Sequence, residues 1–198
     1  MRRLPSMNPN PLHIMTTDAG RILVPLARAA IGRELGLALP APADAAWLRT
    51  PGAAFVTLFN KDGELRGCIG TLEAHRPLVD DVMANAVAAA FRDPRFKPLG
   101  HDEFAAIDIE VSLLSAMEIL HFDDEAGALT QLRPEIDGVV LQFGRHRSTF
   151  LPQVWEQFPD RAEFIAHLKY KAGLPPDFWS NEMKLSCYTV SKWREADL

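Results

Sequence analysis

AAFVTLFNKDGELRGCIGTL, residues 53–72, predicts two antiparallel strands joined by a tight turn. Aromatic and β-branched residues fill the first strand, 53–60, and Asp62-Gly63 is a strong hairpin-turn signal. The second strand, 65–72, carries a cysteine between two glycines. Glycine weakens a strand, so its presence indicates either a close approach to the backbone or a bulge in a twisted sheet. The hairpin therefore marks both the start of a sheet and a candidate functional surface.

Helical and strand patterns continue on both sides of this hairpin. Upstream, apolar spacing predicts a helix over 22–35, with Thr17 or Asp18 as its cap. Pro25 is compatible only with a first turn, so that helix could start later. Downstream, a helix is expected over 77–91. The remaining predictions are strands over 106–115, 117–122 (extending or pairing with it), 139–143, 149–151 and 186–193, and helices over 126–132 and after Asp160. This mixture favours an α+β fold, a mainly antiparallel sheet flanked by helices, over a doubly wound sheet.

Composition bounds the class of protein. The chain has 198 residues, a net charge of −5 and two cysteines. Two cysteines are too few for a disulfide framework, and this small number suits a protein of the reducing cytosol. No apolar run reaches the roughly 18 residues of a membrane span. The acidic balance is unfavourable for a general nucleic-acid binder. Residues 1–16 predict a disordered or loosely packed lead-in, and 17–198 are expected to form a single domain of a cytoplasmic protein.

Cys68 is the leading candidate for chemistry. Side chains alternate along a strand, so Arg66 and Cys68 should project from the same face, roughly 6.6 Å apart at the backbone. A nearby guanidinium favours the reactive thiolate, whereas burial favours the inert thiol. The alternative is a small core filler, since free cysteine is often buried. Exposure of the thiol therefore decides between a nucleophile and a packing residue.

Other polar residues suggest further possibilities. Asp108 and Glu110 share one face of the predicted strand over 106–115, where they could act as acid and base or simply meet solvent. Asp93 and Arg95 follow a helix end, where they could line the mouth of a cleft or be solvated. For each pair, simple exposure to solvent is the default interpretation.

No cofactor motif stands out. The six histidines are scattered, and the chain has no C-x-x-C pair and no glycine-rich phosphate loop. The sequence therefore predicts no metal site and leaves the cofactor unknown. Arg145 and Arg147 in a predicted turn are the best candidates for an anionic partner, although a solvated hairpin tip is the favoured interpretation.

Several motifs together give the sequence a family resemblance. They are LRGCIG at 65–70, AFRDPRF at 90–96, EVSLL at 110–114, FLPQV at 150–154, and KAGLP at 171–175 followed by Trp179. On these motifs the chain, from about Ala19 to Glu195, resembles the AMMECR domain family. Bacterial and archaeal members of that family are called AmmeMemoRadiSam system protein A.

The resemblance implies an α+β fold with a larger and a smaller subdomain and the hexapeptide near a cleft between them. It also implies that the gene lies near genes for Memo-like proteins and radical S-adenosylmethionine enzymes. These proteins are therefore the expected partners. The family resemblance brings no settled activity, so no substrate is transferred from it.

Two functions compete closely on these observations. The first is a cytosolic enzyme or enzyme component whose expected catalytic residues are Cys68, Arg66 and Glu110. The expected ligand-binding residues are Gly67, Gly70, Arg92 and Arg95, the glycines through backbone N–H groups that could hold an oxyanion. The second function is a non-catalytic module that binds a protein, a peptide or a small molecule in the same cleft. A nucleic-acid-binding regulator is a third, less favoured option.

Overall fold

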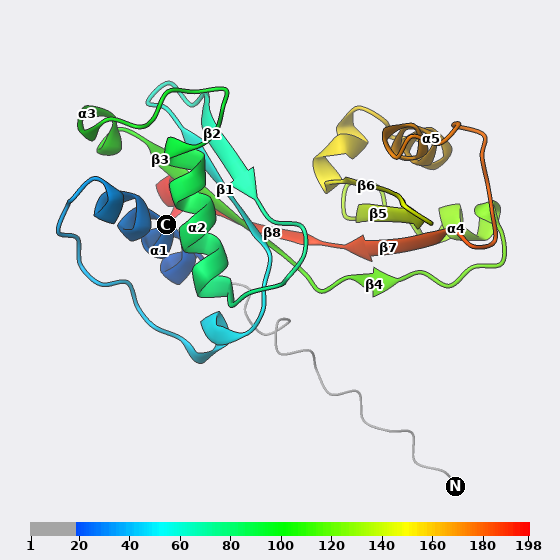
Figure 1. Cartoon of the computed structure of the whole chain (residues 1–198), viewed down its shortest axis with the longest axis horizontal. Coiled ribbons are helices and arrows are strands. Elements are labelled where there is room, and N and C mark those ends of the chain that lie inside the picture. The colour runs from blue at the N-terminus through cyan, green and yellow to red at the C-terminus, as the bar shows by residue number, and fades with distance from the viewer. Residues whose placement is uncertain (1–18) are drawn as a thin grey trace, which may run out of the picture. The chain divides into compact units, whose positions relative to one another are not determined.

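The computed structural model describes residues 19–198 of the chain. These residues divide into two compact units, and both are shown in Figure 1. Unit 1 runs to Leu113 and regains Ser191–Leu198, and unit 2 comprises Leu114–Val190. Each unit contains one four-stranded sheet and its own hydrophobic core. The predicted mixture of helices and antiparallel strands is therefore confirmed.

Unit 1 is built on the predicted hairpin. β1 (Ala54–Phe59) and β2 (Leu65–Gly70) pair antiparallel, and the turn between them uses Gly63, whose φ of 78° suits glycine. β3 (Asp108–Leu114) pairs antiparallel with the other edge of β1. β8 (Val190–Arg194) completes the strand order β2-β1-β3-β8.

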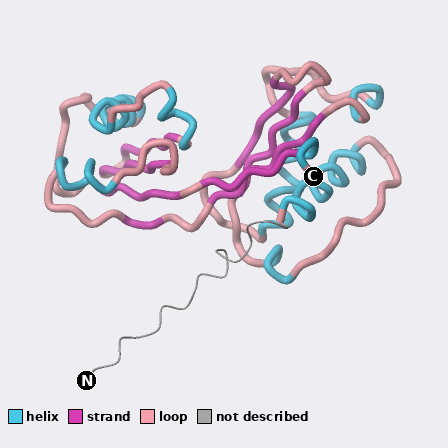
Figure 2. Tube along the Cα trace, turned by 180° about the vertical axis from the view of Figure 1, so that it is seen from behind, coloured by secondary structure: helices cyan, strands magenta, loops and turns pink. Residues whose placement is uncertain are grey.

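Two helices cover one face of this sheet. α1 (Gly20–Glu34) and α2 (Leu78–Phe91) form a core with alternate residues of the strands, among them Val56, Leu58 and Ile109. Figure 2, seen from behind, shows the strands in front of these helices. We call the side of the unit 1 sheet opposite α1 and α2 the outer face. The shorter elements of unit 1 are η2 (Ala46–Arg49), α3 (His101–Phe104) and η4 (Glu195–Asp197).

Unit 2 also consists of a four-stranded sheet and helices that share a core. Its antiparallel sheet has the order β4-β7-β5-β6, formed by β4 (Glu118–Ile119), β5 (Gly138–Phe143), β6 (His146–Phe150) and β7 (Lys184–Tyr188). The helical elements are α4 (Glu125–Gln131), η3 (Pro152–Glu156) and α5 (Arg161–Lys171). In its core, the rings of Trp155 and Phe164 stack with centroids 3.7 Å apart. The predicted cap of α5 is present, because the Asp160 carboxylate accepts the N–H groups of Ala162 and Glu163.

The chain end differs from its prediction. Residues 186–193 were expected to form one strand, but β7 and β8 are two strands in two different sheets. Polar and apolar residues keep a strand-like pattern through this stretch, so the pattern alone does not reveal that the pairing partners change. The segment predicted over 117–122 contributes only β4, which pairs with β7.

The first helix also departs from expectation. α1 begins at Gly20, so Pro25 lies inside the helix instead of its first turn. A proline there lacks one backbone donor, and the burial of Leu23, Ala27 and Ile31 in the unit 1 core offsets that loss. The lead-in over 1–16 and the cap at Thr17 or Asp18 lie outside the described residues. In the described part of the chain, no helix has the length and apolar character needed to span a bilayer.

Candidate functional site

The outer face of the unit 1 sheet carries the predicted cysteine. On β2, Gly67 and Ile69 face the helices, so Cys68 between them projects from the outer face. The thiol is partly exposed, and the Thr57 hydroxyl lies 3.3 Å from its sulfur as a hydrogen-bond donor. Cys68 is therefore not part of the packed core of unit 1.

A row of polar side chains crosses the sheet at Cys68. Thr57 of β1 lies opposite Cys68 on one side and opposite Glu110 of β3 on the other. On β8, Lys192 follows, with its Nζ 4.0 Å from Glu110 Oε1. Paired residues share a face, so a thiol, a hydroxyl, a carboxylate and an ammonium group succeed one another across four strands. We call Cys68, Thr57, Glu110 and Lys192 the outer row.

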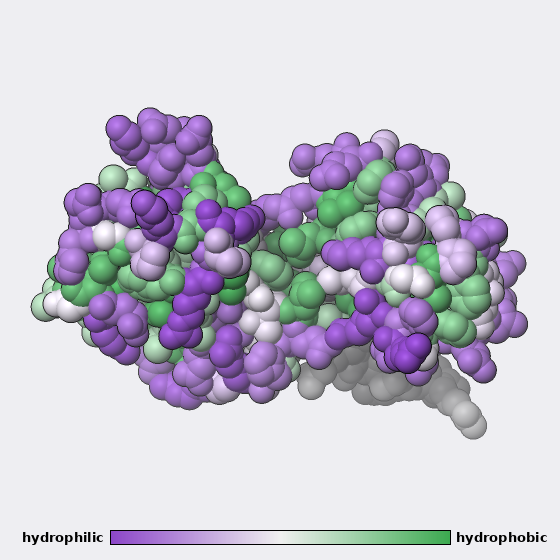
Figure 3. All heavy atoms as spheres, turned by 45° about the horizontal axis from the view of Figure 1, so that its top comes forward, coloured by the Kyte–Doolittle hydropathy of each residue, from purple (hydrophilic) through white to green (hydrophobic). Residues whose placement is uncertain are grey.

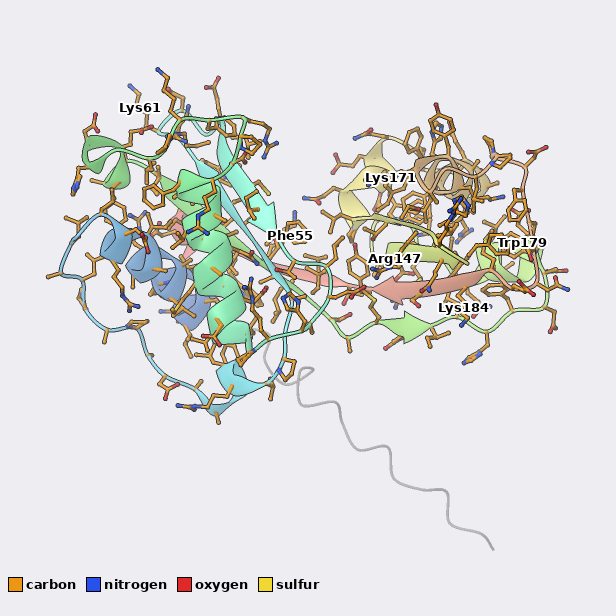
Figure 4. The ribbon with its side chains drawn as sticks, in the orientation of Figure 1. Phe55, Lys61, Arg147, Lys171, Trp179 and Lys184 are labelled. Carbon is orange, nitrogen blue, oxygen red and sulfur yellow. The ribbon has the colours of Figure 1, made fainter. Side chains whose placement is uncertain are left out.

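Aromatic side chains flank this row. Phe55 and Phe59 lie two residues before and after Thr57 on β1, so they share its face and are partly buried. Phe55 lies beside the end of β2 (Figure 4). Arg194 covers Phe59, with its guanidinium 4.2 Å from the ring centroid, and pairs with Asp108 at 2.5 Å. The outer face is thus amphipathic, with a polar row between aromatic groups.

The segment after α2 binds the free edge of β2. Asp93 is 4% exposed, and its Oδ2 accepts the Cys68 N–H at 2.9 Å. Arg95 donates to the two Asp93 carboxylate oxygens at 2.9 and 2.7 Å and lies 3.4 Å from the Cys68 carbonyl oxygen. The Arg95 hydrogen bonds, joined by that from Cys68, hold the pKa of Asp93 far below its usual value. Asp93 is therefore buried instead of solvated, and it holds the backbone of Cys68 through this hydrogen bond.

Arg66 is directed to a different partner. The pairing register shifts at this point, so no residue of β1 lies opposite Arg66. Its guanidinium donates to the Glu103 carboxylate at 2.9 and 3.1 Å and to the Lys97 carbonyl at 2.9 Å, and its side chain is 12% exposed. Hydrogen bonds from Arg66 lower the pKa of Glu103. The guanidinium in contact with Cys68 is that of Arg95, and the charge of Arg66 is paired with Glu103.

The glycines of the hexapeptide make room for atoms of unit 1 itself. A Cβ at Gly67 would lie 2.2 Å from the Ala89 carbonyl oxygen of α2. A Cβ at Gly70 would lie 2.1 Å from the Phe55 ring. The close approach expected at both positions therefore comes from α2 and Phe55, and an oxyanion role for their backbone stays a prediction.

Arg92 lies apart from the outer face. It lines a groove of about 350 Å³ together with Arg33 and Arg76 on the helical side of unit 1. Arg95 and Arg92, which were predicted to bind one ligand, thus serve two different surfaces.

The other sequence candidates belong to unit 2. Cys187 faces the unit 2 core, where burial raises the pKa of its thiol to about 12. Arg145 and Arg147 are exposed at the β5–β6 turn and on β6 (Figure 4 labels Arg147). Within residues 19–198, no group of three or more His, Cys, Asp or Glu side chains is placed to hold a metal ion.

Comparison with known proteins identifies the family. A family model described as AMMECR1 matches residues 24–193, which include both units. The chain belongs to the AMMECR1 family. A protein of Methanothermobacter thermautotrophicus is 39% identical over 187 residues, which cover 91% of this chain and 96% of that protein. Protein MJ0810 of Methanocaldococcus jannaschii is 35% identical over 174 residues, covering 86% and 87% of the two chains.

A solved structure supports the same assignment. The crystal structure of an uncharacterized protein, PH0010 from Pyrococcus horikoshii, is similar with a TM-score of 0.72 and 33% sequence identity. The match covers 89% of this chain and 91% of that chain. The resemblance found in the sequence is therefore confirmed, while the names of these AMMECR1-family relatives state no activity.

Thr57 and Lys192 of this AMMECR1-family site escaped the sequence reasoning, and the contact of Asp93 with Cys68 was not foreseen. Thr57 could have been found, because it is the polar residue at the centre of an otherwise apolar strand, facing away from the core. Lys192 joins the outer row only because β8 pairs beside β3, which the sequence does not reveal. Asp93 reaches Cys68 through a loop conformation that leaves no periodic signal.

The outer row can support chemistry that needs a sulfur atom and a titratable carboxylate. Cys68 and Glu110 are two strand spacings apart, about 10 Å at the backbone. A molecule lying over Thr57 could therefore contact both groups at once. The AMMECR1-family chain thus offers a thiol on an anchored strand, with acid–base and cationic groups along the same line.

Proposed function

We propose that this AMMECR1-family protein is a cytosolic enzyme, or a component of one, that acts through Cys68 on the outer face of unit 1. The observation that carries the proposal is the outer row, in which a partly exposed thiol shares one face with Thr57, Glu110 and Lys192. The substrate would be a small molecule or a peptide lying across Thr57. Its chemical identity is left to experiment.

Each residue has a distinct part in this proposal. Cys68 Sγ contacts the substrate as the nucleophile, and the Thr57 hydroxyl orients the sulfur. Glu110 gives or takes a proton, and Lys192 supplies a positive charge beside it. Arg95 and Asp93 hold the Cys68 backbone, which keeps the sulfur at a fixed height above the sheet.

Arg66 has an indirect part. Its contacts with Glu103 and the Lys97 carbonyl fix the segment that carries Arg95 against β2. We therefore infer a positioning role for Arg66 instead of direct contact with the substrate. The family resemblance further suggests a Memo-like protein and a radical S-adenosylmethionine enzyme as partners of the same pathway.

A non-catalytic binding module is the second candidate. Within residues 19–198, the Cys68 thiol has a hydrogen bond from Thr57 and none with a histidine, so no strong base is joined to it. The aromatic groups of Phe55 and Phe59 beside the row are suited to binding a peptide. Under this alternative, the outer face docks a partner protein or peptide, and Cys68 contributes shape only.

Alkylation tests whether Cys68 is a reactive group. Iodoacetamide consumes the thiolate, so its rate should be followed by mass spectrometry from about pH 6 to about pH 9 in the folded protein. Cys187 is the matched internal control, because it is 6% exposed and its pKa is raised to about 12. We expect Cys68 to be modified first, and Cys187 only after denaturation. A native Cys68 as unreactive as Cys187 would remove the nucleophile from the proposal.

Partner capture separates the enzyme from the module. The wild type, Cys68→Ser and Cys68→Ala should be compared for complex formation with the neighbouring Memo-like and radical S-adenosylmethionine proteins, and for substrate turnover by that assembly. Turnover that is lost in both variants supports the enzyme. A stoichiometric complex with full function in Cys68→Ala supports the module.

A further inference from the structure

The groove between α1 and α2 carries a second set of convergent charges. Its volume of about 350 Å³ lies at the lower end of the range for small-molecule pockets, about 300–1,000 Å³. Arg33 and Glu34 at the end of α1, Asp80 in the first turn of α2, and Arg92 at the end of α2 all line it. The groove is therefore surrounded by charges of both signs.

The floor of this groove is apolar. Met83, Ala84 and Val87 of α2 line it and are partly exposed. No charged residue occurs on α2 from Val82 to Phe91, although one side of this helix is not covered by the core. Figure 3 shows hydrophobic surface lying between hydrophilic residues on this unit. A helix that is apolar on its exposed side as well is suited to cover an apolar ligand.

The charges around the floor are uncommitted. Within residues 19–198, the guanidinium groups of Arg33 and Arg92 make no hydrogen bond or ion pair, and the same holds for the Glu34 and Asp80 carboxylates. Arg76, the third arginine of the groove, pairs with the buried Asp81 at 2.8 Å. The groove thus presents two free cations and two free anions around a hydrophobic surface.

We propose that the α1–α2 groove binds a small zwitterionic molecule with an apolar body, such as an apolar amino acid or short peptide with free termini. Arg33 and Arg92 receive its carboxylate, Glu34 and Asp80 receive its ammonium group, and the apolar body covers Met83 and Val87. A ligand with charges of one sign would place a like charge beside one of these groups, so the rim selects against polyanions such as nucleic acid. The proposal is independent of the chemistry at Cys68.

The test is a nuclear magnetic resonance titration of the full isotope-labelled chain with leucyl-leucine. The probe series adds the N-acetylated and the C-amidated dipeptide, each of which lacks one charge. We expect saturable shifts at groove residues, with each blocked form bound about two- to fivefold more weakly, the range for one exposed ion pair. Absence of saturable shifts, shifts outside the groove, or equal affinity for all three forms would overturn the proposal.

Two charge variants assign the ends of the ligand. In Arg92→Gln, the penalty for C-amidation should shrink, because only Arg33 then faces the carboxylate, whereas the penalty for N-acetylation should remain. Asp80→Asn should show the opposite pattern. Lys184→Gln, at an exposed lysine of unit 2, is the control and should leave all three affinities unchanged.

A floor variant guards against an effect of charge alone. Met83→Glu should abolish binding of the dipeptide. The separate variant Met83→Leu should bind it like the wild type, because leucine keeps the apolar surface. Unchanged binding in Met83→Glu would place the dipeptide elsewhere and overturn the assignment.

Discussion

Cys68 and Cys187 occupy comparable strands and meet opposite environments. Each lies in a four-stranded sheet with helices packed on one face. Cys68 projects from the outer face of unit 1, whereas Cys187 projects into the core of unit 2 and is 6% exposed. Strand alternation alone separates the two, since a shift of one residue moves a side chain to the other face. The comparison shows that strand register decides which of the two thiols is exposed.

The edge strands of the two units extend the comparison. In unit 1, a buried carboxylate and a guanidinium bind the N–H and C=O groups of Cys68 on the edge of β2. In unit 2, the edge strand β6 receives a lysine, with Lys171 Nζ 2.9 Å from the Thr149 carbonyl (Figure 4). At both edges, charged side chains bind backbone groups of the edge strand, and charged groups there disfavour pairing with other chains. Only the unit 1 edge fixes the strand residue that carries a thiol.

The largest expected effect is at Gly67, which sets the distance between β2 and α2. In Gly67→Ala, the new Cβ would lie 2.2 Å from the Ala89 carbonyl oxygen, a backbone atom that cannot move alone. We expect urea unfolding to show a loss of about 2–3 kcal/mol, the upper part of the range for overpacking a close contact. Gly127→Ala in α4 of unit 2 is the matched control, because its Cβ would lie 3.2 Å from a flexible carboxylate. Equal stability of the two variants would refute the packing role of Gly67.

The next effect concerns Asp93, which anchors Cys68 in unit 1. Asp93→Ala leaves the Cys68 N–H and the Arg95 guanidinium without their acceptor, and we expect a loss of about 2 kcal/mol in urea unfolding. Asp177→Ala, an exposed aspartate of unit 2, should change stability by less than about 0.5 kcal/mol. If both variants cost the same, the anchor is not a stabilising element.

Asp93 also gives unit 1 an acid dependence. A folded-state pKa below the unfolded value of about 3.9 adds stability that is present above that value and is lost as the pH falls toward the folded pKa. Asp93→Asn should therefore flatten the fall in stability below about pH 4. If the fall in stability below about pH 4 were unchanged in this variant, carboxylates other than Asp93 would be its cause.

An alkaline dependence is expected for unit 2. The pKa of Cys187 is raised to about 12 by burial, so above its unfolded value of about 8.5 the unfolded chain loses a proton that the folded chain keeps. Stability is complete below that unfolded value and should then fall by at most about 1.4 kcal/mol per pH unit. Urea unfolding from about pH 8 to about pH 11 measures this slope. Cys187→Val should reduce this slope; an unchanged slope would show that groups other than Cys187 cause it.

Local pattern predicted most elements of the fold. The hairpin over 53–72 was recognised because β-branched and aromatic residues flank Asp62-Gly63, and the β3 strand because its residues alternate cleanly. The break between β7 and β8 was missed because the change there is one of pairing partner, not of side-chain period. Periodicity reports which face a residue occupies and says nothing about which strand lies beside it.

The same limit explains the mixed outcome at the candidate site. Glu110 and Cys68 were expected to share a surface, and their common pairing with Thr57 brings them to one face. Arg66 was expected beside the thiol, but a register shift and the Glu103 carboxylate direct it elsewhere. The glycines of this strand were compatible with a bulge, but the position of the register shift and the ion pair of Arg66 with Glu103 cannot be read from a single sequence. Whether these residues are catalytic stays a prediction until the alkylation and turnover experiments are made.

The smallest expected effect is at Lys192, the end of the outer row. Its Nζ is 4.0 Å from Glu110, and the two side chains are 38% and 19% exposed, so solvent screens most of their attraction. Lys192→Ala should cost at most about 0.5 kcal/mol in urea unfolding. On the same strand, Arg194 pairs with Asp108 at 2.5 Å and covers Phe59, so Arg194→Ala should cost about 1 kcal/mol.

These two variants decide whether the outer row belongs to the framework of unit 1. A double-mutant cycle of Lys192→Ala with Glu110→Gln measures their coupling directly. Weak coupling means that both charges remain available to a molecule lying over Thr57, because little folding energy is invested in their mutual contact. Coupling as large as that between Arg194 and Asp108 would instead make the row a structural element of unit 1.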